Sequence, residues 1–255
     1  MLLAVDVGNT NTVLGLFTGE ELVRSWRITT HARATGDEMA LTFRGLLDEQ
    51  PEITGLVLCS TVPSVLHELR PMLSSFFHEI PVVIVEPGTK TGVPILTDNP
   101  KEVGADRIVN AVAAVERWGY PIVVVDFGTA TTFDVVDHDG AYIGGVIAPG
   151  VNLSLQALHQ MAAALPHVDI AKPKEVIGKN TVSCMQSGVF WGYIGLVKEI
   201  CRKIKEEKKE AMRVVATGGL APLLQSTEKL FENVEENLTM QGLRLIFDYN
   251  KSLES

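Results

Sequence analysis

Two similar strand-to-turn motifs, about 120 residues apart, constrain the fold of this chain more than any other feature. The first reads Asp6-Val7-Gly8-Asn9-Thr10-Asn11 and the second reads Asp126-Phe127-Gly128-Thr129-Ala130-Thr131. Each follows a short apolar run, so each is expected to place a carboxylate at the end of a buried strand and a glycine in a tight turn. Because the two motifs stand at corresponding places, they predict two similar halves that arose by internal duplication.

The first half contains alternating strand and helix patterns around the first motif. Three apolar or alternating segments predict an antiparallel meander, and two helical periodicities and two buried strands follow. The predicted strands are residues 2–5, 12–17, 22–28, 55–59 and 82–85, and the predicted helices are residues 37–47 and 65–77. This β-β-β-α-β-α-β order is typical of an α/β fold.

The second half repeats this plan around the second motif. A strand at residues 122–125 is followed by a meander through 132–136 and 143–148, with a turn at His138-Asp139-Gly140. Helices are predicted at residues 153–164 and 182–208, and a strand at 213–216 ends at Thr217-Gly218-Gly219. Gly188, Gly192 and Gly195 lie along the second helix, where they favour close helix packing or, alternatively, a subunit interface.

Composition argues against several function classes. The chain has 255 residues, a formal net charge of −9 and a pI of about 5.2, so no nucleic-acid partner or anionic membrane partner is expected. The widely spaced Cys59, Cys184 and Cys201 show no zinc-site spacing and favour reduced thiols. No signal-peptide pattern is present, and no apolar stretch approaches the ~18 residues of a membrane span. A cytoplasmic protein is therefore expected.

The chemistry of the two turns points to a nucleotide triphosphate. Backbone N–H groups, hydroxyls and amides after the glycine can bind phosphate oxygens, and the carboxylates can hold Mg²⁺ through its waters. Phosphoryl transfer depends mostly on positioning and charge neutralisation, so few further groups are needed. The P-loop, Rossmann, Gly-x-Ser-x-Gly and His-Glu-x-x-His motifs are absent.

A third segment, Asn99-Pro100-Lys101-Glu102-Val103-Gly104-Ala105-Asp106-Arg107, predicts a helix start. Asn99 is expected to be the N-cap, so the helix would begin at Pro100 and carry Asp106 in its second turn. Asp106 would share a face with Val103, Asn110 and Ala113, a mostly small surface that could leave room for a ligand. A carboxylate placed there suits a general base that accepts the proton of a substrate hydroxyl. Arg107 suits an anionic substrate group. The alternative is a surface Asp–Arg pair without function.

Taken together, these motifs resemble those of type III pantothenate kinases, which belong to the superfamily of acetate kinase, sugar kinases, actin and heat-shock chaperone ATPases. The resemblance runs from residue 3 to about residue 247 and includes residues 6–11, 104–107, 126–131, 149–150, 180–188, 217–219 and 238–243. It implies an α/β fold of two ribonuclease H-like (actin-like ATPase) halves, residues 1–117 and 118–255. Each half would be a mixed five-stranded sheet with flanking helices.

The resemblance also implies a reaction: transfer of the ATP γ-phosphate to the primary hydroxyl of pantothenate, the first step of coenzyme A synthesis. Asp106 would be the general base, Asp6 would bind Mg²⁺ through water, and Asp126 would bind a monovalent cation, K⁺ or NH₄⁺. The implied phosphate contacts are Asp6, Val7, Gly8, Asn9, Thr10, Asn11, Thr12, Val13 and Thr129. The implied pantothenate contacts are Gly104, Ala105, Asp106, Arg107 and Thr181, in a protein expected to be a homodimer.

The sequence departs from the family pattern at Thr97, near which many members carry a tyrosine. Three other functions stay open: an inactive regulator on the same fold, an ATP-driven assembly protein like actin, and a kinase for another small alcohol. The presence of Asp6, Asp106 and Asp126 favours an enzyme over an inactive regulator. The chain is too short for the extra subdomains of an assembly protein, and residues 104–107 favour pantothenate over another alcohol.

Overall fold

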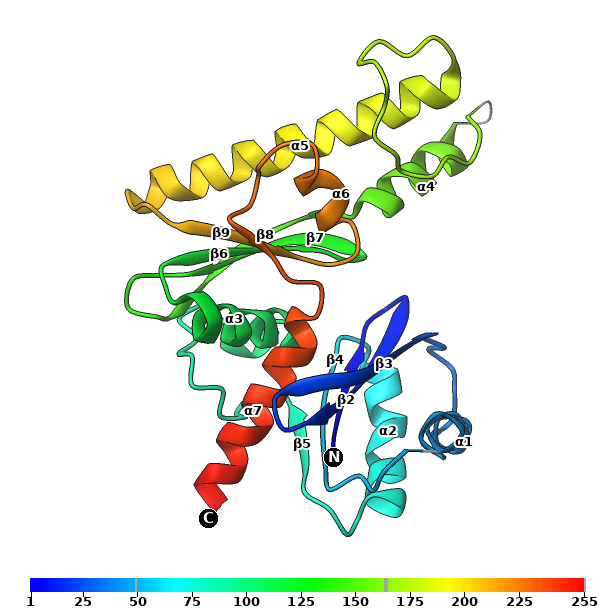
Figure 1. The fold of residues 1–255 in the computed structure, drawn as a ribbon, viewed down its shortest axis with the longest axis vertical. Helices are drawn as coiled ribbons and strands as arrows, with labels where there is room; N and C mark the ends of the chain where they lie inside the picture. The colour runs from blue at the N-terminus through cyan, green and yellow to red at the C-terminus, as the bar shows by residue number, and fades with distance from the viewer. Residues whose placement is uncertain (49, 163–164, 255) are drawn as a thin grey trace. The chain divides into compact units, whose positions relative to one another are not determined.

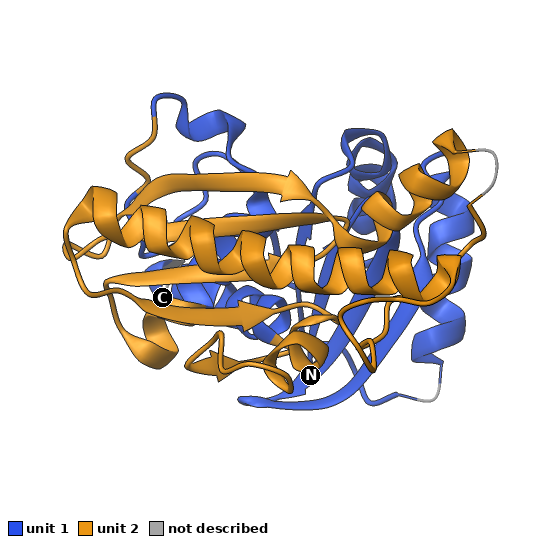
Figure 2. Ribbon diagram, turned by 90° about the horizontal axis from the view of Figure 1, so that it is seen from above, with its two compact units in different colours: residues 1–94, 98–113, 238–255 blue, residues 95–97, 114–237 orange. Residues whose placement is uncertain are grey.

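The computed structural model describes residues 1–48, 50–162 and 165–254 (Figure 1). Its contacts divide the chain into two compact units, coloured separately in Figure 2 and described here one at a time. Unit 1 comprises residues Met1–Pro94, Asp98–Ala113 and Leu238–Ser255, and unit 2 comprises Ile95–Thr97 and Ala114–Asn237.

Unit 1 contains a mixed five-stranded sheet with strand order β3-β2-β1-β4-β5. The strands β1 (Leu2–Val7), β2 (Asn11–Thr18) and β3 (Glu21–Thr29) form the predicted antiparallel meander. β4 (Gly55–Ser60) runs parallel to β1, and β5 (Val82–Val85) runs parallel to β4. The parallel pairing brings the ends of β1 and β4 to the same edge of the sheet, next to the first motif.

The sheet of unit 1 is covered on both faces, as Figure 1 shows. Leu3, Val5 and Val7 pack in one core with the helices α1 (Gly36–Leu47) and α2 (Pro63–Phe76). Side chains alternate along a strand, so Asp6 points to the opposite face, where α7 (Leu238–Glu254) packs on β1, β4 and β5.

Unit 2 repeats this topology, with strand order β10-β9-β6-β7-β8. β6 (Ile122–Phe127), β7 (Ala130–Val136) and β8 (Tyr142–Pro149) form the second meander. β9 (Arg213–Thr217) pairs in parallel with β6, and β10 (Asn233–Val234) in parallel with β9. The two matching sheets confirm the predicted fold class.

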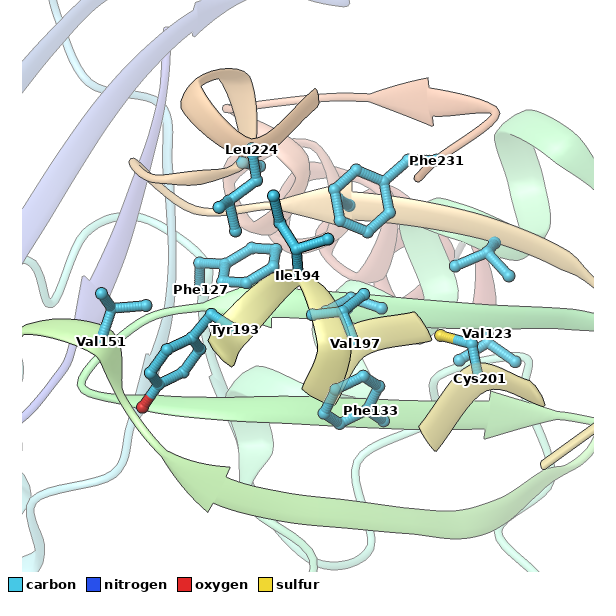
Figure 3. Close-up of a cluster of buried hydrophobic side chains, with 14 of the residues drawn as sticks. Val123, Phe127, Phe133, Val151, Tyr193, Ile194, Val197, Cys201, Leu224 and Phe231 are labelled. Atoms are coloured by element: carbon cyan, nitrogen blue, oxygen red, sulfur yellow. The ribbon is translucent and has the colours of Figure 1, made fainter. Parts of the chain in front are cut away.

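One face of the second sheet is buried beneath α5 (Thr181–Lys208), with α4 (Val151–Met161) and α6 (Ala221–Gln225) beside it (Figures 1 and 3). Phe127 and Phe133 of the sheet pack in this core with Tyr193, Ile194 and Val197 of α5 (Figure 3). Within the described ranges, no helix combines the length and apolar character needed to cross a bilayer.

The predicted helix start at Pro100 is wrong, although Asn99 is an N-cap. Asn99 Oδ1 accepts a hydrogen bond from the Lys101 N–H (3.3 Å), but this cap begins only the short 3₁₀ helix η1 (Pro100–Glu102). The carboxylate of Glu102 accepts from the Asn99 side-chain amide (2.6 Å), and Val103 then adopts an extended conformation that ends the turn. The helix α3 (Ala105–Trp118) begins afresh, so Asp106 lies in its first turn instead of a second.

The compact units do not follow the division at residues 117 and 118. α7 belongs to unit 1 because its apolar side chains pack on that sheet; a Cβ on Gly55 would lie only 2.3 Å from the Phe247 ring. The halves 1–117 and 118–255 describe an internal duplication of the sequence, and this division stays a prediction. The predicted helix at residues 153–164 ends at Met161 as α4, and residues 163–164 lie outside the described residues.

Candidate active site

The first motif forms a tight turn between β1 and β2 in unit 1. The Gly8 N–H donates to the Asn11 carbonyl (3.0 Å), and a Cβ on Gly8 would lie 3.1 Å from that same oxygen. Thr61, just after β4, supports the turn by donating its N–H to the Val7 carbonyl (2.9 Å). Asn9 and its neighbour Thr10 are exposed at the tip. The turn therefore offers backbone N–H, amide and hydroxyl groups to a ligand, as expected of a phosphate-binding turn.

Asp6, immediately before this turn, lies beside a buried thiol. Strand register places Asp6 opposite Cys59, and the Cys59 Sγ–H donates to Asp6 Oδ1 at 3.3 Å. Burial and, to a smaller extent, the nearby negative charge of Asp106 raise the pKa of Asp6 to about 6, although the Cys59 hydrogen bond and the Arg27 charge partly oppose this rise. Two carboxylates thus share one partly buried site.

Asp106 is held at the N-terminal end of α3. Its Oδ1 accepts the Arg107 N–H at 2.9 Å, and a Cβ on Gly104 would lie 2.6 Å from the same oxygen. Burial raises the pKa of Asp106, and the Arg107 backbone N–H and charge partly oppose this rise. The glycine therefore leaves room for a carboxylate folded back over the helix start, where the helix dipole favours negative charge.

The rest of the predicted Asp106 face is not open to a ligand. Asn110 is 1% exposed and Ala113 is 2% exposed. The Thr239 hydroxyl of α7 donates to Asn110 Oδ1 at 2.8 Å, and a Cβ on Gly242 would lie 2.1 Å from the Val109 carbonyl. This part of the prediction is wrong, because α7 covers that face and anchors α3. Residues 104–107, at the start of α3, stay partly exposed.

The second motif forms the corresponding turn between β6 and β7 in unit 2. Two glycines from other segments pack against it. A Cβ on Gly150 would lie 2.0 Å from the Thr129 carbonyl, and one on Gly218 would lie 2.6 Å from the Phe127 carbonyl and 2.8 Å from Asp126 Oδ1. Gly218 also has a φ of +88°, which L side chains rarely adopt. Side chains are thus absent where the backbone closes around Thr129 and Asp126.

Gly150 is also the N-cap of α4, and no side chain caps this helix. The N–H groups of the first turn of α4 therefore begin beside the Thr129 turn. A helix N-terminus with uncapped N–H groups attracts anions through its dipole and its hydrogen-bond donors. Unit 2 consequently brings a hydroxyl, a carboxylate and a helix start to one turn, against which two glycines pack closely.

Thr181 is the remaining predicted contact, and it lies exposed at the first position of α5 in unit 2. The preceding Asn180 caps the helix by accepting the Ser183 N–H at 2.9 Å. Thr97, where the sequence departs from the family pattern, also belongs to unit 2, and its hydroxyl is buried. Among the residues that the structure describes, no three His, Cys, Asp or Glu side chains group as a metal site.

Sequence reasoning did not assign Cys59, Gly150 or Gly218 to the site. Gly150 and Gly218 lie in stretches noted for their family resemblance, and a glycine next to a strand end was the signal available for both. No local signal marked Cys59, because its contact with Asp6 depends on the register of two strands that lie far apart in the chain.

The raised pKa of Asp6 predicts a pH-dependent cost to stability. An unfolded Asp6 ionises near 3.8 and the folded one near 6, so the folded state binds more protons between these values and stability falls as pH rises through them. Asp6→Asn should therefore stabilise the protein at pH 8 by on the order of 1–3 kcal/mol, and the gain should shrink toward pH 4. Urea unfolding of both proteins at the two pH values measures this difference.

The matched control for that experiment is Asp37→Asn, at an exposed carboxylate in the first turn of α1. It should give no gain at pH 8, because an exposed carboxylate pays no desolvation penalty. If Asp6→Asn changed the free energy of unfolding equally at pH 4 and pH 8, the description of Asp6 as a buried carboxylate with a raised pKa would be contradicted.

Comparison with known proteins agrees with this geometry. The family model for type III pantothenate kinases matches residues 2–203. A type III pantothenate kinase of Roseobacter denitrificans is 55% identical over 257 residues, covering 100% of both chains. A type III pantothenate kinase of Streptomyces coelicolor is 52% identical over 263 residues and covers 99% of both.

Solved structures share the fold at low sequence identity. A Campylobacter jejuni protein described as a Baf-family transcriptional activator has a TM-score of 0.62 at 19% identity, over 98% of this chain and 99% of that one. The activator of 2-hydroxyisocaproyl-CoA dehydratase from Clostridium difficile, with bound ADPNP, has a TM-score of 0.51 at 11% identity, over 99% and 96%. These structures support the actin-like ATPase fold, and the full-length relatives and the family match show that the chain belongs to the type III pantothenate kinase family.

Proposed function

We propose that the protein transfers the γ-phosphate of ATP to the primary hydroxyl of pantothenate, in the cytoplasm, as the first step of coenzyme A synthesis. The observation that carries this proposal is the partly buried Asp106 carboxylate, adjacent to Asp6, at a helix start in a chain of this family. A general base must be ionised and able to reach the hydroxyl proton, and Asp106 lies in the partly exposed first turn of α3.

In this proposal Asp106 accepts the proton of the pantothenate hydroxyl as the oxygen attacks the γ-phosphorus. The neighbouring Arg107 guanidinium suits the pantothenate carboxylate, because a planar fork of donors matches two carboxylate oxygens. Gly104 and Ala105 would contact the substrate through their backbone, and Thr181 would contact it through its hydroxyl. The raised pKa of Asp106 brings it closer to the working pH, which favours proton transfer in the transition state.

The two turns would hold the ATP phosphates. Residues 6–13 supply N–H, amide and hydroxyl donors, and Thr129 supplies a second hydroxyl next to the first turn of α4. The Thr129 turn suits a phosphate contact, because it lies beside the uncapped first turn of α4 and its backbone is fixed by close packing against Gly150 and Gly218. Phosphate binding by backbone donors needs few charged side chains, in agreement with the acidic composition.

Mg²⁺ and a monovalent cation fit the available oxygen ligands. Mg²⁺ keeps most of its waters when it binds substrate phosphates, and the Asp6 carboxylate would hold the ion through these waters. Asp126, at the carboxyl end of β6, offers the oxygen proposed for K⁺ or NH₄⁺. When bound, these ions neutralise part of the negative charge of the phosphates.

A panel of acceptors tests the substrate assignment. The purified protein would be incubated with ATP, Mg²⁺ and K⁺ together with pantothenate, N-acetylglucosamine or acetate, and ADP release would be followed. We expect acceptor-dependent ADP release with pantothenate alone. If ADP were released with another acceptor and not with pantothenate, that acceptor would be the substrate instead. If no acceptor caused ADP release although ATP bound, the protein would be an inactive regulator.

We also propose that the protein is a homodimer whose interface includes α4 and α5. These helices line a groove of ≈ 600 Å³ with largely apolar side chains, among them Leu158, Met185 and Leu196. Apart from the backbone of α5 itself, no described atom lies within 4 Å of a Cβ added at Gly188, Gly192 or Gly195, so close packing against another element of the chain is not the reason for these glycines. A subunit interface, the alternative for these positions, would cover this apolar groove.

Gly188→Arg should therefore convert the dimer into a monomer, because a guanidinium would enter the apolar groove. Sedimentation equilibrium should give twice the chain mass of 27.7 kDa for the wild-type protein and one chain mass for the variant. Gly45→Arg, at a helix position with equally open space in unit 1, is the matched control and should stay dimeric. A monomeric wild-type protein would contradict the proposed assembly.

A further inference from the structure

A second cavity lies in unit 1, away from the two carboxylates. It has a volume of ≈ 330 Å³ and lies between the sheet and the helices α1 and α2. Val7, Phe43, Val65 and Leu69 line it and are nearly fully buried. Side chains alternate along β1, so Val7 faces this cavity from one side of the sheet while Asp6 points to the other. The cavity therefore lies on the face of the sheet opposite Asp6, and it shares Val7 and Thr12 with the proposed phosphate contacts.

One end of the cavity is polar. The hydroxyls of Thr12 and Thr30 hydrogen-bond each other at 2.9 Å, and both residues line the wall. Thr12 is buried and Thr30 is half-buried, and a hydroxyl has one donor and two acceptor lone pairs, so their mutual bond leaves acceptor capacity on each oxygen and one O–H donor for a ligand. The size and the combination of an apolar body with a few polar groups are typical of small-molecule sites.

The charges at this polar end favour an anion. His31, Arg33 and Glu38 line the exposed rim. The Glu38 carboxylate is already used as the capping-box acid of α1, accepting from the Thr35 N–H (2.8 Å) and the Thr35 hydroxyl (3.1 Å). The Arg33 guanidinium makes no hydrogen bond or ion pair with any residue that the structure describes. Its donors are available to a ligand.

We infer that this cavity binds a small monocarboxylate whose apolar body lies against Phe43 and Leu69 and whose carboxylate reaches Arg33 and the threonine hydroxyls. The apolar part would be a single ring or a short branched chain, since the cavity volume is at the lower end of the range for ligand sites. The site is distinct from that of pantothenate in the proposed function.

Ligand binding in this cavity is linked to the turn between β1 and β2. Val7 and Thr12 line the cavity and flank the Gly8–Asn11 turn, which closes through the Gly8 N–H to Asn11 carbonyl hydrogen bond. A ligand that contacts both residues would change the conformational freedom of that turn. This step, unlike ligand binding itself, rests on the proposed function. A ligand bound in the cavity would then change the KM for ATP more than the KM for pantothenate.

Isothermal titration of the full-length protein with 4-phenylbutyrate tests the site without relying on catalysis. 4-Phenylbutan-1-ol is the neutral comparison, because it keeps the apolar body and lacks the charge. We expect 4-phenylbutyrate to bind about 10-fold more tightly than the alcohol, and Arg33→Gln to remove this difference. Thr42→Trp, on the exposed wall of the cavity, should abolish binding of both, whereas Thr42→Ala should leave it unchanged.

Three outcomes would overturn the inference. They are no binding of 4-phenylbutyrate to the wild-type protein, binding that survives both Arg33→Gln and Thr42→Trp, and equal affinity for the acid and the alcohol. A shift in the KM for ATP on adding 4-phenylbutyrate, lost in Thr42→Trp, would support the link to the turn. Should the protein lack kinase activity, the titration would still decide whether the site exists.

Discussion

Asp106→Asn should lower kcat by about 100-fold or more while leaving the fold intact, because the amide cannot accept the hydroxyl proton. The substitution keeps the size of the side chain and its hydrogen bond from the Arg107 N–H. It also removes the negative charge that raises the pKa of Asp6, so the stability of the variant should be equal to or greater than that of the wild-type protein. Steady-state kinetics with pantothenate and ATP, together with thermal unfolding, measure both effects.

Asp37→Asn is again the matched control, since Asp37 is an exposed carboxylate in the first turn of a helix of the same unit. Its kcat should stay within about twofold of wild type, because it contacts no reacting group. If Asp106→Asn retained wild-type kcat, Asp106 would not be the base and the substrate hydroxyl would have to lose its proton to another group.

Gly150→Ala should abolish most of the activity, with a loss of about 100-fold or more, because the space around Thr129 cannot hold a methyl group. The added Cβ would lie 2.0 Å from the Thr129 carbonyl oxygen and 2.9 Å from that of Gly128, and both are backbone atoms that cannot rotate away. The turn and the start of α4 must separate, and the donors proposed for phosphate would move with them. The KM for ATP should rise together with the fall in kcat.

Gly45→Ala is the control, at a helical glycine where, apart from the helix backbone, no atom of the described residues lies within 4 Å of an added Cβ. It should keep full activity and gain about 0.5–1 kcal/mol of stability, because alanine loses less entropy than glycine in a helix. Wild-type kinetics for a folded Gly150→Ala protein would show that the Thr129 turn does not bind the phosphates.

Much of the fold could be predicted from the sequence because local pattern and global topology agree. The two meanders follow from short alternating segments separated by tight turns, and the structure has them at β1–β3 and β6–β8. β10 could not be predicted, because two residues are too short to show a period. The position of α7 on the first sheet depends on contacts such as Gly55 with Phe247, which no local pattern reveals.

Site residues that belong to a local sequence motif were predicted, whereas site residues whose contacts join distant parts of the chain were missed. Asp6 and Asp106 were named from their motifs, and the structure brings both into one partly buried environment. The helix start before Asp106 was misplaced because Asn99 caps a 3₁₀ turn, and a sequence cannot distinguish it from the first turn of a longer helix. The thiol of Cys59 reaches Asp6 only through strand register.

The most direct test of the proposed function is the identity of the phosphorylated product. The protein would be incubated with pantothenate, ATP and Mg²⁺ in K⁺ or in Na⁺, and the product would be examined by mass spectrometry and ³¹P NMR. We predict pantothenate carrying one phosphoryl group on its primary hydroxyl, formed in K⁺ and much less in Na⁺. Unmodified pantothenate in both salts, with ATP binding intact, would contradict the assignment of a pantothenate kinase activity to this chain.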